Sequence, residues 1–504
     1  MELLHNIGLG FLVAFDPTNL FLCFLGVFIG TLIGVLPGIG PTGTMSILLP
    51  VTFQLNPVGA IIMFAGIYYG SLYGGSTTSI LVNIPGEAAC AITCLDGYQM
   101  ALKGRAGPAL GIAAFGSFIA GTISIIGLML VAPPLANLAI RFGPPEYFCL
   151  MCLGLTILIY LASGSVIKAL MMATFGIILG CISQDPMTGS TRFAYNILEL
   201  FDGIGIAPFV MGLFGISEIF LNIEVAIKQR QILNTKVKEL FPNRRDWAVS
   251  IKPILRGSFL GFFLGILPGA GAIISSFASY AIEKKVSKHP EKFGTGAIEG
   301  VAGPESANNA ASCSCLIPLL TLGIPTHAVT ALLLGALMIH GVTPGPLLIP
   351  QNPQLFWGVV LSMYIGNVML VGLNLPLIGI WVQVLKVPYK ILFPLILLFC
   401  IIGAYSLNNS IFDMGIMLVF GAVGYLMKKF KYEHAPLVLA FVLGPMLEIS
   451  LRQSLQMSRG SFSIFFTRPI SGILIGLAIF MLITSIIPFM GKLRQAIPKE
   501  EDEV

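Results

Sequence analysis

The sequence predicts an all-α polytopic integral membrane protein with about 10–14 membrane segments. The 504 residues are 56% hydrophobic and only 10% charged, with a mean hydropathy of +0.91, whereas soluble domains carry about 25% charged residues. Many continuous apolar runs approach the ~20 residues that a spanning helix needs. The net charge of +5 is explained by loop lysines, so we expect contact with the lipid bilayer and no nucleic-acid partner.

One motif occurs twice and divides the chain into two halves. Residues 30–40 and 261–271 both have the pattern G-x-x-x-G-[VI]-L-P-G-x-G. Proline removes a backbone donor and glycines permit turns, so each helix should break at the motif. A break inside the bilayer leaves polar backbone groups that must face protein, water or a ligand. Matched breaks in two halves are typical of the binding site of a transporter, although G-x-x-x-G alone is common where membrane helices pack.

The expected segments follow the apolar runs. They lie at 20–37, 45–53, 58–84, 108–132, 146–162, 165–182 and 204–222, and then at 257–283, 326–342, 355–380, 390–404, 411–427, 435–448 and 470–490. We therefore divide the chain into a first transmembrane repeat (1–222), a basic cytoplasmic linker (223–256), a second repeat with the C-terminal spans (257–491) and a charged tail (492–504).

The charge pattern predicts how the second motif sits in the membrane. Eight Lys or Arg residues and two acids lie between Lys228 and Arg256, and four lysines follow between Lys284 and Lys292. Since cytoplasmic loops collect such charge, residues 257–283 should form a re-entrant helical hairpin with two arms of roughly a dozen residues, about 18 Å each. No basic residue flanks the first motif until Lys103. We therefore expect the first motif to open on the opposite face, which makes the two repeats inverted.

The candidate site residues are mostly neutral and lie at or near the two breaks. Hydroxyls, amides and free backbone N–H groups suit an anion with several oxygens, and carbonyls with hydroxyls suit a small cation. The alternative for any Ser or Thr is a hydrogen bond to its own helix turn. The candidate substrate-binding residues are Gly38, Gly40, Thr42, Ser76, Thr77, Thr78, Gly269, Gly271, Asn308 and Asn309. The candidate cation-binding residues are Asn83, Glu305, Ser306 and Ser312.

Few charged groups lie near the breaks. Glu305 is expected either to bind a cation or proton or to cap a helix start, and Glu87 has the same two interpretations. His327 either titrates near neutral pH or is structural. No catalytic residue, metal site or tightly bound cofactor is expected.

Four stretches carry a resemblance to a known family. They are LPGIGP (36–41), YGGSTT with NIPGE (73–78 and 83–87), LPGAG (267–271), and PESANNAA with IPLLTLGIP (304–311 and 317–325). Together they resemble the large membrane subunit of tripartite tricarboxylate transporters over most of the chain. The segment 312–315 and Thr326 depart from the family pattern, where Ala or Gly is usual, and their side chains narrow the space there.

The resemblance implies a cation-coupled secondary importer of citrate or related carboxylates in the bacterial inner membrane, with sodium or a proton as the coupling ion. It also implies two partners, a small membrane subunit and a periplasmic solute-binding protein. An ion channel subunit would need a continuous polar path, and a membrane-embedded lipid-modifying enzyme would need a nucleophile–base pair or metal ligands. The sequence favours a transporter over both. By analogy with other hairpin-containing carboxylate transporters, we expect elevator-type movement against a scaffold that includes 146–182 and 390–427.

Overall fold

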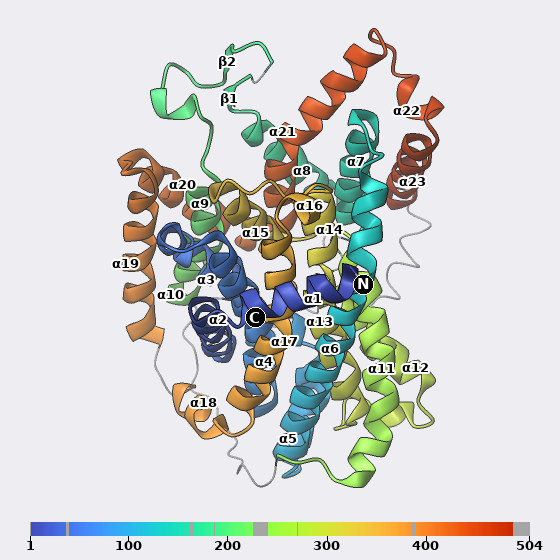
Figure 1. The fold of residues 1–504 in the computed structure, drawn as a ribbon. Helices are drawn as coiled ribbons and strands as arrows, with labels where there is room; N and C mark the ends of the chain where they lie inside the picture. The colour runs from blue at the N-terminus through green and yellow to red at the C-terminus, as the bar shows by residue number, and fades with distance from the viewer. Residues whose placement is uncertain are drawn as a thin grey trace.

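The computed structural model describes residues 2–36, 40–161, 165–185, 187–224, 240–269, 271–385 and 389–486. This part of the chain is a bundle of helices (Figure 1). Its strands are β1 (Ser183–Gln184) and β2 (Thr191–Arg192), which pair antiparallel in a two-residue ladder. The expected all-α class is therefore confirmed.

Seven helices in the described part are long and apolar enough to cross a membrane. They are α2 (Pro17–Val35), α4 (Pro57–Val82), α6 (Ala106–Ala139), α11 (Arg244–Ile266), α17 (Pro353–Asn374), α20 (Ile411–Lys429) and α21 (His434–Met457). Six further apolar helices have 10–17 residues within their apolar stretches. The protein is thus a multi-pass membrane protein by the length and composition of its helices.

The remaining elements connect and flank these long helices. The α-helices are α1 (Glu2–Ala14), α3 (Gly40–Leu48), α5 (Gln99–Leu102), α7 (Pro144–Leu161), α8 (Val166–Gly180), α9 (Ile206–Val210), α10 (Ser217–Glu224), α12 (Gly271–Val286), α13 (Glu299–Ser314), α14 (Leu316–Leu322), α15 (Ala328–Ile339), α16 (Leu348–Gln351), α18 (Ile378–Val384), α19 (Tyr389–Asn408), α22 (Ile464–Thr467) and α23 (Pro469–Ile486). Short 3₁₀ or π turns are η1 (Pro50–Gln54), η2 (Ala88–Cys90), η3 (Cys94–Tyr98), η4 (Leu198–Leu200), η5 (Met211–Ile216) and η7 (Pro290–Lys292).

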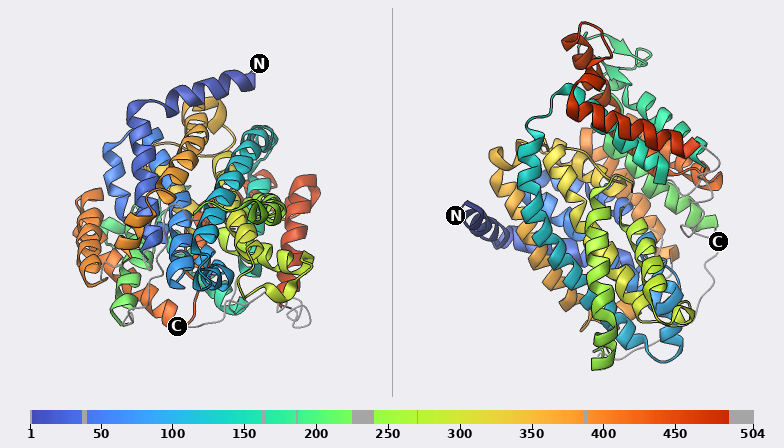
Figure 2. Two further views of the ribbon diagram at one scale, coloured as in Figure 1. Left: turned by 90° about the horizontal axis from the view of Figure 1, so that it is seen from below. Right: turned by 90° about the vertical axis from the view of Figure 1, so that its right-hand side faces the viewer.

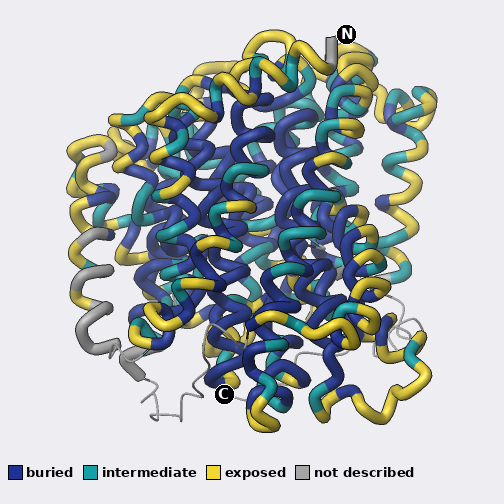
Figure 3. Tube along the Cα trace, turned by 60° about the horizontal axis from the view of Figure 1, so that its bottom comes forward, coloured by how far each residue is buried: buried dark blue, intermediate teal, exposed yellow. Residues whose placement is uncertain are grey.

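Helix α1 lies on the outside of the bundle (Figure 2), whereas α4 forms part of the interior. In the apolar stretch of α4 that is long enough to span a membrane, 94% of the residues are buried. Buried backbone fills the middle of the bundle in Figure 3, and exposed residues lie around its rim. The polar residues of α4 are therefore held inside protein.

In the first half, α2 packs closely against α4 through glycines spaced four residues apart. A Cβ atom added to Gly30 would lie 2.5 Å from the carbonyl oxygen of Ile67, and one added to Gly34 would lie 2.1 Å from that of Ser71. Real Cβ atoms do not approach so closely, so only glycine permits this backbone contact.

The second half repeats this packing between α11 and α13. Cβ atoms added to Gly261 and Gly265 would lie 2.1 Å and 2.6 Å from the carbonyl oxygens of Ala307 and Ala311. The G-x-x-x-G part of each repeated motif is therefore a helix-packing device, and the same local contact is built twice. The inverted relation of the two halves stays a prediction.

Helices α11 and α12 form a hairpin with the second break at its tip. Arg256, ten residues before the end of α11, binds the carboxylate of Glu283 near the end of α12, with Nε 2.8 Å from Oε1. This contact requires the two helices to run antiparallel. Its position in the membrane as a re-entrant element stays a prediction.

The expected arm lengths are wrong for α11. This helix has 23 residues, about 34 Å at 1.5 Å per residue, and is not a half-length arm. It begins at Arg244 because the side chain of Asn243 accepts the backbone N–H of Asp246, and the Asp246 carboxylate in turn accepts the N–H of Asn243. Residues 244–256 of the expected linker are therefore helical, and the expected tail 492–504 lies outside the described residues.

The start of α11 and the end of α12, which carry basic residues such as Arg245 and Lys284, lie at one end of the bundle. Arg105 at the start of α6 forms an ion pair with Asp246 in the first turn of α11. This end is at the bottom of Figure 1, and β1, β2 and α22 lie at the opposite end.

Candidate functional site

The first break packs against the segment NIPGE (83–87), which follows α4. Helix α2 ends at Val35 and α3 begins at Gly40, which has a φ of +63°. A Cβ atom added to Gly86 would lie 1.8 Å from the carbonyl oxygen of Gly34, and one added to Gly40 would lie 3.3 Å from Oε2 of Glu87. Glu87 therefore faces the first break. Gly38 lies outside the described residues.

The second break packs against the equivalent segment GIPTH (323–327), which follows α14. The N–H of Gly269, whose φ is +79°, donates to the carbonyl oxygen of Thr326 at 2.8 Å. A Cβ atom added to Gly271 would lie 4.0 Å from Cγ of His327. His327 thus occupies, at the second break, the place that Glu87 occupies at the first.

A polar cluster centred on Glu305 joins the two halves. Oε2 of this carboxylate, on α13, accepts the hydroxyl of Ser76 from α4 at 2.6 Å and the side-chain N–H of Asn308 at 3.2 Å. Oε1 accepts the hydroxyl of Thr93. All four side chains are almost completely buried. Among the ion pairs of the described residues, none includes Glu305.

Asn309 extends this cluster to a third helix, α6. Its Nδ2 donates to Oδ1 of Asn308 and to the hydroxyl oxygen of Ser117, each at 2.7 Å. The Ser117 hydroxyl donates to the carbonyl oxygen of Glu305 at 3.3 Å. Both asparagines expected at the site are therefore fixed beside Glu305. We call Ser76, Thr93, Ser117, Glu305, Asn308 and Asn309 the Glu305 cluster.

A small cavity borders this cluster. Its volume is about 10 Å³, which holds about one water molecule. Oδ1 of Asn374, one of the lining residues, is buried without a hydrogen-bond partner. The lining residues are Tyr73, Ser76, Thr77, Leu110, Ala113, Ala114, Ser117 and Asn374. Ser76 and Thr77 thus face a space too small for a carboxylate in this conformation.

Several expected site residues make their hydrogen bonds within the local helix packing. Ser306 and Ser312 donate to the carbonyl oxygens of Ala302 and Asn309 on their own helix, which is the structural alternative for a helical serine. Thr78 donates to the carbonyl oxygen of Val35 at 2.9 Å and so ties α4 to the end of α2 beside the first break.

Asn83, Ser312 and Thr42 lie away from the centre of the cluster. Asn83 ends α4 in the left-handed conformation, with a φ of +59°, two turns or about 10 Å beyond Ser76. Ser312 lies the same distance along α13 from Glu305, and Thr42 is in the first turn of α3. The structure thus gathers Ser76, Thr77, Glu305, Asn308 and Asn309, and it places Gly40, Thr42, Gly269 and Gly271 at the breaks.

Sequence reasoning missed two members of the cluster, Thr93 and Ser117. Each lies in an apolar stretch without a motif, and each reaches Glu305 only because η3 and α6 pack against α13. No local signal identifies them.

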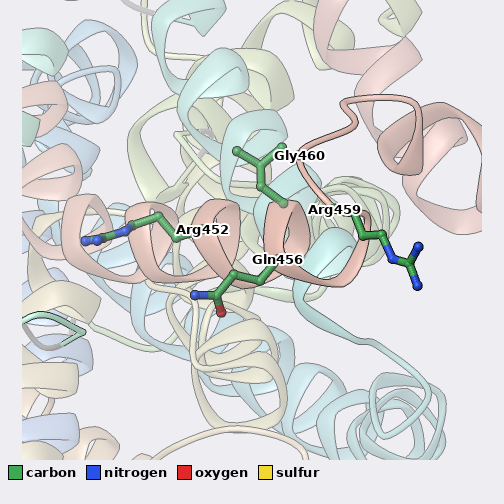
Figure 4. Close-up of a pocket in the computed structure, with 5 residues that line it drawn as sticks. Arg452, Gln456, Arg459 and Gly460 are labelled. Atoms are coloured by element: carbon green, nitrogen blue, oxygen red, sulfur yellow. The ribbon is translucent and has the colours of Figure 1, made fainter.

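A larger hollow lies at the far end of α21 and contains none of the expected site residues (Figure 4). Its volume is about 390 Å³, and Arg452 and Arg459 are among its lining residues. Arg452 also binds the carboxylate of Asp185 at 2.7 Å, and this hydrogen bond holds the pKa of Asp185 well below its usual range. The hollow therefore belongs to an ion-paired surface and not to the breaks.

The family comparison decides between a transporter and an enzyme. The model of the tripartite tricarboxylate transporter TctA family matches residues 20–439, which include both breaks and the Glu305 cluster. The chain belongs to this family. As a TctA-family protein it is a component of a tripartite tricarboxylate transporter and is not an enzyme, so the resemblance seen in the sequence is confirmed and the lipid-modifying alternative is excluded.

Two relatives of this TctA-family protein come from Agrobacterium vitis. One, described as "Uncharacterized 52.8 kDa protein in TAR-I ttuC' 3'region", is 51% identical over 502 residues, which is the whole of both chains. The other, "Uncharacterized protein in TAR-II ttuC' 3'region", is 52% identical over 242 residues, 48% of this chain and all of the relative. No solved structure matches the chain.

Proposed function

We propose that this TctA-family protein is the permease of a cation-coupled secondary importer of tri- or dicarboxylates. Its partners are a small membrane subunit and a periplasmic solute-binding protein, and it resides in the bacterial inner membrane. The family supports this proposal, and so do the two matched breaks, because such breaks place helix ends where a transported ion can meet them.

The observation that supports cation coupling is the buried carboxylate of Glu305, which has no ion-pair partner among the described residues. A buried charge costs free energy unless it is paired, bound to a cation or neutralised by a proton. Its hydrogen-bond donors, Ser76, Thr93 and Asn308, are all neutral. We propose that sodium or a proton binds Glu305 during transport. Sodium would gain the hydroxyl oxygens of Ser76 and Thr93 as further ligands once their hydrogens turn away.

The other expected cation ligands stay proposals, and the structure supports them less directly than Glu305. Ser306 and Ser312 become ligands only if their hydroxyls leave the helix carbonyls to which they now donate. Asn83 lies at the end of α4, about 10 Å along the helix beyond Ser76.

We place the substrate between the breaks and the Glu305 cluster. The start of a helix carries partial positive charge of about half a unit, and α12 begins at Gly271 with no acid in its first turn. Carboxylate groups are the natural ligands of such helix starts. Because the cavity at Ser76 holds only about one water, this conformation must open before substrate binds. The opening agrees with alternating access, in which the breaks and the cluster move together as one block.

Uptake by paired glycine variants tests this proposal. Labelled citrate and succinate are offered to membrane vesicles that contain the permease and its small subunit, with the binding protein supplied. A Cβ atom at Gly269 would lie 2.8 Å from Cα of Leu158 on α7, and one at Gly341 would meet no atom within 4 Å. Both glycines have a positive φ, so Gly341→Ala is the control for backbone strain.

We expect Gly269→Ala to abolish uptake at normal membrane abundance and Gly341→Ala to retain most of it. Equal uptake by the two variants would show that the second break is a packing device only.

A further inference from the structure

His327 presents a buried N–H group at the second break. Its Nε2 is buried and has no hydrogen-bond partner among the described residues. The imidazole lies between Gly271, at the start of α12, and the ring of Tyr68 from the first half, whose centroid is 5.3 Å from that of His327. A buried polar atom without a partner costs free energy, and at the second break a ligand could satisfy this one.

The hydrogen-bond network around Thr330 defines which nitrogen of His327 carries the proton. The Thr330 hydroxyl donates its hydrogen to the carbonyl oxygen of His327 at 2.8 Å. Oγ1 of the same Thr330 hydroxyl accepts the backbone N–H groups of Thr326 and His327, each at 2.9 Å. The hydrogen and both lone pairs of the Thr330 hydroxyl are therefore used in hydrogen bonds.

The hydroxyl hydrogen of Thr326 then has one suitable acceptor in this network. Nδ1 of His327 lies 2.8 Å from Oγ1 of Thr326, whereas Oγ1 of Thr330 lies at 3.4 Å and already accepts two hydrogens. With Nδ1 as the acceptor, the proton of the neutral imidazole is on Nε2. Thr326 thereby orients His327 as a donor toward the break.

The two breaks differ in the chemistry of this equivalent position. The first break faces the Glu87 carboxylate, whose Oε2 lies 3.3 Å from the Cβ position of Gly40. The second faces an imidazole N–H beside the start of α12, and neither α12 nor α15 has an acid in its first turn. An ionised Glu87 would repel an anion at the first break, whereas the His327 N–H and the start of α12 would attract one at the second.

We propose that Nε2–H of His327 donates a hydrogen bond to a carboxylate oxygen of the transported anion, and that Thr326 is a positioning residue that sets its tautomer. This inference rests on the proposed function, since it names the group that the substrate meets at the second break. It makes His327 a substrate-specificity residue of the permease.

His340 provides a matched control for the test. It lies at the other end of the same helix, α15, and its Nε2 is likewise buried with no hydrogen-bond partner in the described part of the chain. Uptake of labelled citrate and succinate is measured in vesicles that contain the complete transporter, and KM and kcat are determined for the acid that the wild type takes up. Variants are compared at equal membrane abundance.

We expect His327→Ala to raise KM at least about tenfold, the loss typical of a hydrogen bond to a charged group, and His340→Ala to leave KM within about twofold, as a residue without a charged partner should. Thr326→Val should raise KM in the same direction, because the tautomer is no longer set, and Thr326→Ser should restore it. A KM for His327→Ala equal to that of His340→Ala, with normal wild-type uptake, overturns the role of His327 alone. Wild-type vesicles that take up neither acid overturn the proposed function, and this inference with it.

Discussion

The hydroxyl of Ser76 lies 2.6 Å from Oε2 of Glu305, and this contact joins residues from opposite halves of the chain. Ser76 is on α4, which packs against the helix before the first break, and Glu305 is on α13, which packs against the helix before the second. A change at either break can therefore reach the same buried carboxylate.

Removing the Ser76 hydroxyl should destabilise the protein. Because the lost hydrogen bond is to a buried carboxylate, we expect Ser76→Ala to lower the free energy of unfolding by about 1–3 kcal/mol, measured by thermal unfolding in detergent. Ser258→Ala is the control, since that buried hydroxyl donates only to Ile254 of its own helix. An equal loss in both variants would contradict the importance of the contact between the halves.

The close helix packing predicts opposite effects for alanine at different glycines. Gly34→Ala and Gly261→Ala should each lower stability by about 1–3 kcal/mol or more, since overpacking displaces a helix. Gly372 is also helical and has no atom within 4 Å of its Cβ position, so Gly372→Ala should raise stability by up to about 1 kcal/mol. Melting temperatures of the three variants test this, and a stable Gly261→Ala would refute the close contact of α11 with α13.

The ion pair across the second hairpin predicts a loss that a double substitution partly restores. The Glu283 side chain is only 2% exposed, so Arg256→Met leaves a buried carboxylate without its partner and should cost about 2 kcal/mol. Arg256→Met with Glu283→Leu should recover part of the loss, because both charges are then removed. Lys252→Ala, an exposed residue on the same helix, should change stability by less than about 0.5 kcal/mol. If the double variant is as unstable as Arg256→Met, the buried charge is not the cause.

Membrane orientation follows from the ends of the bundle. Cysteines at the exposed positions Arg245 and Glu291 should both react with an impermeant maleimide applied from the cytoplasmic side, because basic residues mark that side. A cysteine at Thr188, between β1 and β2 at the opposite end of the bundle (Figure 1), should react only from the periplasm. Labelling of Arg245 and Thr188 positions from the same side would contradict this topology.

The sequence was informative about the helices because continuous apolar runs define them directly. The predicted span 146–162 matches α7 (Pro144–Leu161), and the predicted span 165–182 matches α8 (Val166–Gly180). The start of α11 was missed since its first turns are charged, and the capping residues Asn243 and Asp246 carry no apolar signal. The predicted length of the first hairpin arm is too short for the same reason, because the charged first turns of α11 were not counted.

The sequence indicates which kinds of residue form the site, but it does not indicate which of them are in contact. Two asparagines beside an acid in α13 indicated Glu305 as a candidate, and the structure surrounds it with Ser76 and Asn308 as neighbours. Thr93 reaches Glu305 across the bundle from a segment 212 positions away. Such a contact depends on how helices pack, and no periodicity within either segment encodes it.

We propose that Glu305 couples substrate movement to a cation, and the cation dependence of uptake tests this role most directly. Carboxylate uptake is measured against sodium concentration at fixed pH, and against pH without sodium, for the wild type, Glu305→Gln and Glu146→Gln. Glu146 is also buried, but it is paired with Arg468, so it controls for the loss of a buried carboxylate. We expect Glu305→Gln to lose the dependence on the coupling cation and Glu146→Gln to keep it at reduced stability. Wild-type cation dependence in Glu305→Gln would contradict a coupling role for Glu305.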